Sequence, residues 1–192
     1  MTIYIALLRG INVGGKNIIK MAELKRILET IGLQELQTYI QSGNVLFKSD
    51  ECEESLRKKI EHQIRENFGF SVPVVLRTST ELERIISSCP FSEQEVSEAE
   101  SSEAESQYIS LLTHAPLPEN IELLNAYRSE SDEYRIVGRE VFLLFHHSIR
   151  NSRLANNLKK LDVPSTVRNW KTINKLAALA KAMEIIDKDI KT

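Results

Sequence analysis

Cysteine and long apolar runs are scarce in this 192-residue chain, and each shortage excludes a class of protein. The two cysteines, Cys52 and Cys89, lie far apart and outside any C-x-x-C spacing, which excludes a disulfide framework and a cysteine-based zinc site. We therefore expect free thiols in a cytoplasmic protein. No apolar run approaches the roughly 20 residues of a membrane-spanning helix, so we expect no membrane partner. The N-terminal MTIYIALLRG lacks a basic leader and predicts a strand rather than a signal peptide.

Signatures of metal binding and of common hydrolases are also missing. His146 and His147 are adjacent on an expected strand, so their side chains point to opposite faces, and no acid or thiol stands at a helpful spacing. The chain has no G-x-S-x-G elbow and no Cys–His signature. We predict no metal and no cofactor. Catalytic residues are not identified, and whether the chain is an enzyme stays open.

The net charge is only -2, but the charges are unevenly distributed. The segment Glu93–Glu105 holds six glutamates and no basic residue, whereas the segment Arg150–Lys191 holds ten basic residues and four acidic ones. A basic C-terminal third suggests an anionic ligand or an acidic partner. The alternative is a set of solvated helix faces that the acidic segment balances.

Apolar periodicity in the first half predicts the order β-α-β-β-α-β, followed by a short helix. The four expected strands are residues 3–8, 36–40, 44–49 and 72–77. The expected helices are residues 21–32, 54–69 and 81–88, of which the first two end at Gly32 and Gly69. This order is the split βαβ pattern of ferredoxin-like domains.

The second half shows the same order of strands and helices, although the pattern is weaker. The likeness lies in the order of the elements and not in the amino-acid sequence. Strands are expected at 107–113, 133–137, 140–145 and 163–168, and helices at 118–127, 152–161 and 172–188. We therefore predict an α+β fold of two tandem ferredoxin-like units with antiparallel-rich sheets. The expected boundaries are a first unit at 1–90, an acidic Ser/Glu-rich linker at 91–106, and a second unit with a long C-terminal helix at 107–192.

Apolar residues fall on both faces of the expected sheets, which predicts that the open faces are covered, by the other unit or by a second chain. The oligomeric state therefore stays open. No segment matches the aromatic-rich signature of RNA-binding sheets, so a nucleic-acid partner lacks that support.

The stretch LLRGINVGGKN, residues 7–17, follows the first apolar run and is rich in glycine. Gly10, Gly15 and Lys16 match most of the phosphate-binding pattern G-x-x-x-x-G-K-[ST]. Asn17 stands where that pattern needs the hydroxyl that ligates Mg²⁺. The match therefore does not predict an NTPase.

Two interpretations of this stretch remain. The helix is expected to begin near Met21 rather than at the lysine, so the glycines serve turn geometry in a strand-to-helix crossover. Alternatively, the stretch is an anion-binding loop without NTPase chemistry, in which Arg9 and Lys16 supply the charge.

The segment TVRNWKTINKL, residues 166–176, is a second candidate. Asn169 or Thr172 is expected to cap the last helix, with Trp170 packed beneath it. The functional alternative is an anion site at the start of that helix, reinforced by Arg168.

The third candidate is YIQSGNVLF, residues 39–47. Ser-Gly-Asn between two strands is itself turn chemistry. The alternative is that Ser42 or Asn44 donates a hydrogen bond to a ligand.

The motifs ALLRGINVGGKN, TYIQSGNVLF and TVRNWKTINKL, in this order and at these separations, closely resemble the bacterial domain-of-unknown-function family 1697. The resemblance runs from about Ile3 to Leu179, and the acidic stretch Ser92–Ser106 is its main departure. It implies an α+β fold of ferredoxin-like repeats and no established activity.

The leading functional hypothesis is a site for an anionic ligand, such as a nucleotide, a phosphorylated metabolite or a nucleic acid. We expect the three candidate segments to lie within about 20 Å of one another, the reach of a shared small-molecule pocket. The rival hypothesis is a structural or protein-interaction module in which the same motifs are only turns and caps. The candidate ligand-binding residues are Arg9, Asn12, Gly14, Gly15, Lys16, Ser42, Asn44, Arg168, Asn169, Trp170 and Thr172.

Overall fold

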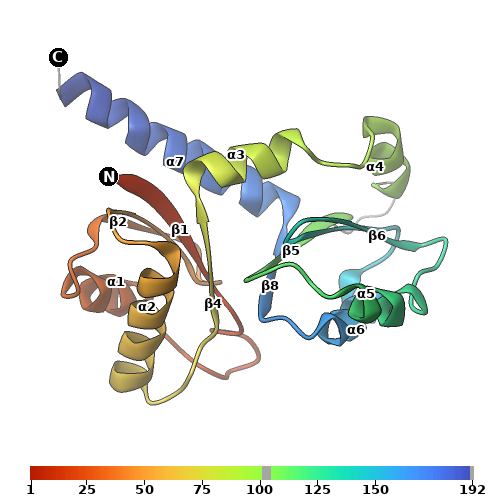
Figure 1. Ribbon diagram of the computed structural model, residues 1–192, viewed down its shortest axis with the longest axis horizontal. Helices are drawn as coiled ribbons and strands as arrows, with labels where there is room; N and C mark the ends of the chain where they lie inside the picture. The colour runs from red at the N-terminus through yellow and green to blue at the C-terminus, as the bar shows by residue number, and fades with distance from the viewer. Residues whose placement is uncertain (101–104, 191–192) are drawn as a thin grey trace. The chain divides into compact units, whose positions relative to one another are not determined.

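The strands predicted from the apolar pattern form two separate four-stranded antiparallel sheets in the computed structural model, which describes residues 1–100 and 105–190. The chain divides into two compact units (Figure 1). Unit 1 comprises Met1–Ile86 together with the chain from Ile173 on, and unit 2 comprises Ser87–Thr172. The α+β class and the antiparallel sheets are therefore confirmed.

Unit 1 contains a sheet with the strand order β2-β3-β1-β4. Its strands are β1 (Thr2–Leu8), β2 (Gln34–Tyr39), β3 (Asn44–Ser49) and β4 (Val74–Thr78). Its helices are α1 (Met21–Glu29), α2 (Glu53–Phe68), α3 (Ser79–Ser87, of which the last residue is assigned to unit 2) and the larger part of α7 (Trp170–Ile190).

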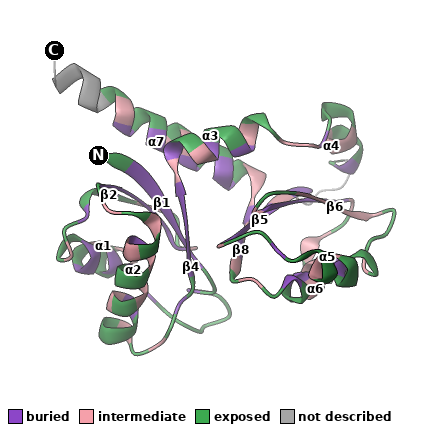
Figure 2. Cartoon of the chain, in the orientation of Figure 1, coloured by how far each residue is buried: buried purple, intermediate pink, exposed green. Residues whose placement is uncertain are grey.

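The main core of unit 1 lies between the sheet and the helices α1 and α2. The cluster contains alternate residues of β1 together with the apolar face of each helix, among them Ala6, Leu24 and Leu56. Figure 2 shows β1 buried along almost its whole length, and Ile5 and Leu7, which point to the opposite face, are fully buried as well. Both faces of this central strand therefore lie out of water.

Unit 2 has the strand order β6-β7-β5-β8. Its strands are β5 (Gln107–Leu112), β6 (Asp132–Val137), β7 (Glu140–Phe145) and β8 (Ser165–Asn169). Its helical segments are α4 (Glu93–Ala99), α5 (Pro118–Asn125), η1 (Ile149–Asn151), α6 (Arg153–Asn157) and η2 (Leu158–Leu161), and its core contains Leu112, Leu124, Leu143 and Leu158.

The similarity between the units extends to residues, which element order alone did not reveal. In β1 and β5 the sequences YIALL and YISLL occupy matching positions, and both units carry a Val-Pro pair just before their last strand. Ile5 pairs with Arg77, and Ile109 pairs with Arg168 in the same way. The amides of Arg9 and Thr113 donate to the carbonyls of Pro73 and Pro164, each at 3.0 Å. The units therefore share a register as well as an element order.

Three segments differ from the sequence-based prediction. The expected linker at 91–106 contains α4, because Ser92 and Glu95 form a reciprocal capping box; residues 101–104 of that linker lie outside the described residues. The helix expected at 152–161 is broken into α6 and η2. The last helix begins at Trp170 rather than Thr172, and from Ile173 on it belongs to unit 1, whereas it was expected in the second unit.

Candidate functional site

The glycine-rich stretch forms a surface loop between β1 and α1. Ile11 and Ile19 are 1% exposed and anchor the loop to the core of unit 1. Between these anchors every residue from Val13 to Ile18 is exposed. The loop is therefore fixed at both ends and open to solvent in its middle.

The loop departs from a P-loop as the sequence predicted, because α1 begins only at Met21. Asn17 adopts a left-handed φ of 48°, and its side-chain amide donates to the carbonyl of Gly10 at 3.1 Å. This bond closes the loop on itself and brings Asn17 back beside Gly10. The side chain that replaces the P-loop hydroxyl is thus a structural crosslink.

Asn12 joins this loop to the turn between β2 and β3. Its side-chain amide donates to the carbonyl of Ile19 at 2.9 Å and to the carbonyl of Gln41 at 2.8 Å. Its side-chain oxygen accepts from the Ile19 amide at 2.8 Å. A sequence-predicted ligand residue therefore uses its amide to hold two of the predicted segments together.

The turn is tightly packed against the end of β1. The Leu8 amide donates to the carbonyl of Gly43 at 2.8 Å. A Cβ built on Gly43 would lie 2.7 Å from Cδ1 of Ile11 and 2.8 Å from Cβ of Leu8. Asn44 is buried and donates to the carbonyl of Tyr39 and to Oγ of Ser42, each at 3.0 Å. Turn chemistry therefore accounts for the observed contacts of Asn44.

The exposed side chains around Asn12 combine positive charge with apolar surface. Arg9 and Lys16 are exposed, and within residues 1–100 and 105–190 their side chains have no ion pair or hydrogen bond. Val13 is 66% exposed, Ile18 is 65% exposed and Ile40, next to Gln41, is 50% exposed. We call Arg9, Val13, Gly14, Gly15, Lys16, Ile18 and Ile40 the loop–turn surface.

The predicted segment at residues 166–176 belongs to unit 2 as far as Thr172, and its side chains there have structural roles. Arg168 donates to Oγ1 of Thr166 at 2.6 Å and to the carbonyl of Val167 at 2.9 Å, and burial lowers the pKa of its guanidinium to about 10. The Asn169 side chain accepts from the Thr172 amide at 2.8 Å, which confirms Asn169 as the cap of α7.

Trp170, the next residue of this segment, lies at the first position of α7. Its ring centroid is 6.1 Å from that of Phe142 on β7. That the Arg168–Thr172 segment shares a ligand with the other two segments stays a prediction.

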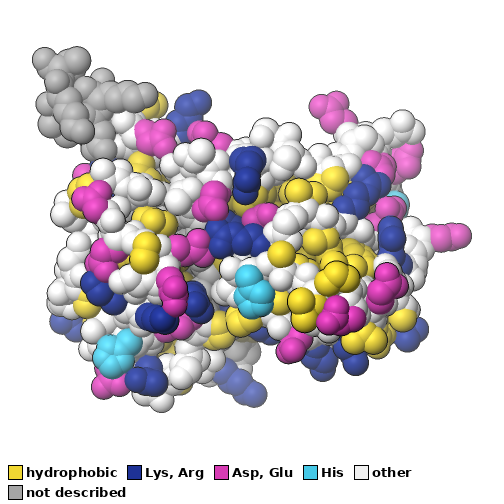
Figure 3. Space-filling view, in the orientation of Figure 1, with side chains coloured by type: hydrophobic (Ala, Val, Ile, Leu, Met, Phe, Trp, Pro, Cys, Tyr) yellow, Lys and Arg dark blue, Asp and Glu magenta, His cyan; other side chains and the backbone are white. Residues whose placement is uncertain are grey.

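Charged side chains elsewhere on the surface are paired in part and are mixed in sign. In α2, Lys58 forms an ion pair with Glu54 at 2.6 Å. Lys59 forms another with Glu51, which lies just before the helix, at 2.7 Å. Figure 3 shows acidic and basic side chains interspersed over the face that it draws.

In the described part of the chain, no group of three or more His, Cys, Asp and Glu side chains is placed to hold a metal ion. None of the described helices has the length and apolar character that crossing a membrane requires.

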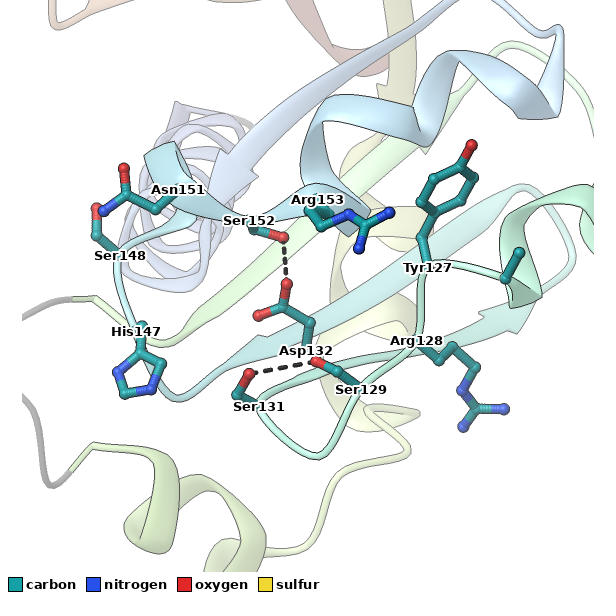
Figure 4. A pocket seen from close by; sticks show the side chains of 11 residues that line it. Tyr127, Arg128, Ser129, Ser131, Asp132, His147, Ser148, Asn151, Ser152 and Arg153 are labelled. Atoms are coloured by element: carbon teal, nitrogen blue, oxygen red, sulfur yellow. Dashed lines mark hydrogen bonds between the residues drawn. The ribbon is translucent and has the colours of Figure 1, made fainter.

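A pocket of about 280 Å³ in unit 2 was not predicted from the sequence. Two segments of chain form it (Figure 4). Residues 126–132 lead from α5 into β6, and residues 147–153 lead from β7 through η1 into α6. Its lining consists of Ala126, Tyr127, Arg128, Ser129, Ser131, Asp132, His147, Ser148, Asn151, Ser152 and Arg153. The signal that could have found it is the density of serine, arginine and histidine in these two connections.

Comparisons with known proteins agree with the fold and give no reaction. The solved structure of the conserved bacterial protein SP0830 from Streptococcus pneumoniae matches with a TM-score of 0.70 at 24% identity, over 93% of this chain and 98% of that chain. A likeness at this identity shows the fold alone. No curated protein matches the chain. The model of a family described as a protein of unknown function, DUF1697, matches residues 1–142. The third motif, residues 166–176, lies outside the matched residues, whereas the other two lie within them. The chain therefore belongs to this family of unknown function, as the sequence motifs predicted.

Proposed function

We propose that unit 1 binds an anionic ligand on the loop–turn surface, and that the bound group is the phosphate of a nucleotide. A free nucleotide and a nucleic acid present the same group, and the experiment below distinguishes them. The observation that carries the proposal is that the charged groups of Arg9 and Lys16 have no partner among the described residues. The side-chain hydrogen bonds that hold the loop in shape are made by Asn12 and Asn17 instead.

The backbone of the loop adds hydrogen-bond donors to this charge. Gly14 and Gly15 have left-handed φ values of 58° and 73°, and within the described residues their N–H groups have no hydrogen-bond acceptor. No atom would lie within 4 Å of a Cβ on either glycine, so a ligand can approach the backbone closely. Exposed amides beside cationic side chains are the donor set that phosphate oxygens prefer.

The loop is also held in one shape before any ligand arrives. Three hydrogen bonds of the Asn12 side chain and one of the Asn17 side chain fix the backbone between the two core anchors. A preformed loop loses less conformational entropy on binding than a flexible one. The asparagines that looked like ligand residues therefore support the site indirectly.

The apolar members of the surface favour a ligand that carries a ring beside its phosphate. Val13, Ile18 and Ile40 are three of the eight large hydrophobic residues that are strongly exposed in the described chain. An inorganic phosphate would leave them in water, whereas a base or sugar ring would cover part of them. This combination favours a nucleotide over a bare anion.

The test is a titration of the whole chain against two probes. Fluorescence anisotropy with a labelled thymidine oligonucleotide of about 20 residues measures polymer binding, and competition by unlabelled AMP measures binding of the free nucleotide. The double variant Arg9→Ala/Lys16→Ala should raise the Kd at least about tenfold, since each lost phosphate contact weakens binding. The matched control Lys25→Ala/Lys58→Ala removes the same charge from the half-buried Lys25 of α1 and the exposed Lys58 of α2, and should change the Kd less than about twofold.

The two probes separate the sources of the phosphate. Competition by AMP indicates a free-nucleotide site, whereas binding of the oligonucleotide alone, with a steep dependence on salt, indicates a nucleic acid. If neither probe binds, or if the double variant and its control behave alike, the proposal is wrong. That result would favour the protein-interaction module, which the same exposed apolar residues would serve.

We also infer that each unit is a ferredoxin-like repeat. The βαββαβ order and the antiparallel strand orders β2-β3-β1-β4 and β6-β7-β5-β8 support this inference. A cytoplasmic location is likewise a proposal, which the free thiols of Cys52 and Cys89 support.

A further inference from the structure

We propose that the pocket of unit 2 is a second binding site, for a small phosphorylated polyol such as a sugar phosphate. It lies in a different unit from the loop–turn surface and shares no residue with it, so the two proposals stand independently. Its volume of about 280 Å³ is at the lower limit of small-molecule pockets and fits a metabolite of that size.

Asp132, the first residue of β6, supplies a fixed acceptor in the middle of the pocket (Figure 4). The Ser152 hydroxyl donates to Oδ2 of Asp132 at 2.7 Å. The same hydroxyl accepts from the Ala155 amide at 3.0 Å, so its proton is committed to the carboxylate. Within the described residues Oδ1 of Asp132 has no partner, which leaves one carboxylate oxygen to accept a hydrogen bond from a ligand hydroxyl.

Arg153 supplies the charge for an anionic group. It follows Ser152 directly, and Figure 4 shows its guanidinium on the same side of the pocket as Tyr127. In the part of the chain that the structure describes, this guanidinium forms no ion pair and no hydrogen bond, although the carboxylate of Asp132 lines the same pocket. A planar guanidinium with free donors binds phosphate oxygens in a bidentate manner.

The second arginine adds charge without blocking the pocket. The guanidinium of Arg128 stacks over the ring of Tyr134 at 5.2 Å, and Figure 4 shows it extending away from Asp132. The two arginines outnumber the single carboxylate of the lining, so the pocket has a positive surplus that attracts an anion.

The remaining lining is made of neutral polar groups that suit several hydroxyls. Ser129 and Ser131 lie 3.2 Å apart through their hydroxyl oxygens, and Ser148 and Asn151 line the opposite side. Serine and amide groups both donate and accept, as sugar hydroxyls do. Tyr127 offers a ring against which the carbon face of a sugar can pack.

The experiment is isothermal titration of the full chain with ribose 5-phosphate, with inorganic phosphate and with ribose as separate probes. Wild-type protein should bind ribose 5-phosphate at least about tenfold more tightly than either fragment, because the pocket recognises both parts. Arg153→Ala should weaken ribose 5-phosphate at least about tenfold, whereas the nearby exposed Arg150→Ala, outside the pocket, should leave it unchanged. Asp132→Asn should weaken ribose 5-phosphate but not inorganic phosphate, and thermal melting of each variant confirms that it is folded.

The proposal is overturned if wild-type protein binds no ribose 5-phosphate at millimolar concentration. It is also overturned if Arg153→Ala and Arg150→Ala bind alike, or if inorganic phosphate binds as tightly as the sugar phosphate. The variant Arg9→Ala/Lys16→Ala should bind ribose 5-phosphate like wild type, so failure at the loop–turn surface and failure at this pocket are distinguishable.

Discussion

The guanidinium of Arg135 on β6 donates to both carboxylate oxygens of Glu95 in α4. The same guanidinium donates to the carbonyl of Pro90 and lies 4.4 Å from the centre of the Phe91 ring. One side chain therefore attaches the start of the acidic segment to the sheet of unit 2. The hydrogen bonds from Arg135, followed by those of the Ser92 amide and hydroxyl, lower the pKa of Glu95 to about 2.

This ion pair predicts a pH dependence of stability. The pKa of Glu95 falls from an ordinary value of 4.5 to about 2 on folding, so its contribution is complete above pH 4.5 and is lost as the pH falls toward 2. Urea unfolding of wild type and Glu95→Gln should therefore differ at neutral pH and converge in acid. Glu93→Gln, a change in the same helical turn, is the control. A constant difference between wild type and Glu95→Gln over this range would contradict the account.

A buried hydroxyl on β5 predicts a stabilising substitution. Ser110 is fully buried, and its oxygen has no hydrogen-bond partner among the described residues. Alanine occupies the matching position in β1, at Ala6. Ser110→Ala should raise the free energy of unfolding by about 1 kcal/mol, because it removes an unsatisfied buried group. A loss of stability in equilibrium urea unfolding would show that the hydroxyl has a partner.

The hydrogen bonds of the Asn12 side chain predict slow amide hydrogen exchange in the loop. Because the Ile19 amide donates to Oδ1 of Asn12, Asn12→Gly should accelerate hydrogen exchange at Ile19 at least about tenfold. Glycine also fits the left-handed φ of 55° at this position, so backbone strain does not confound the result. Exchange rates in α2 serve as the internal control. Unchanged exchange at Ile19 would mean that the loop is held by other contacts.

The packing of the turn predicts a contrast between two glycines. Gly43→Ala places a Cβ within 3 Å of Leu8 and Ile11 and should cost more than about 2 kcal/mol of stability. Gly14→Ala meets no atom within 4 Å and should cost about 1 kcal/mol, from its left-handed φ alone. Thermal unfolding of both variants compares them directly. Equal losses would show that the turn is not packed against the loop.

The regular elements were predictable because their side chains repeat with a helical or strand period. Leu24, Ile27 and Leu28 are buried in α1 as the spacing predicted, and α2 ends at a left-handed Gly69. The break between α6 and η2 was not predictable from apolar spacing, since Leu154, Leu158 and Leu161 keep a helical period and are buried across it.

The candidate sites were only partly predictable for a different reason. The sequence indicated Asn12 as a ligand residue. Its side-chain amide instead donates hydrogen bonds to carbonyls 7 and 29 residues away, and such contacts cannot be predicted from residue spacing. The pocket of unit 2 combines two segments without any motif. Their content of serine, arginine and histidine is a signal of composition, which does not single out Asp132 or Arg153. Asn169, in contrast, accepts from an amide only three residues ahead, a local capping contact that the sequence predicted for either Asn169 or Thr172.

The most direct test of phosphate binding at the loop–turn surface is a ¹H–¹⁵N spectrum of the whole chain during titration with AMP and, separately, with the thymidine oligonucleotide. With one of these probes, the account predicts progressive shifts of the Gly14 and Gly15 amide signals, and their loss in Arg9→Ala/Lys16→Ala. Shifts confined to other residues, or none with either probe, would contradict the account.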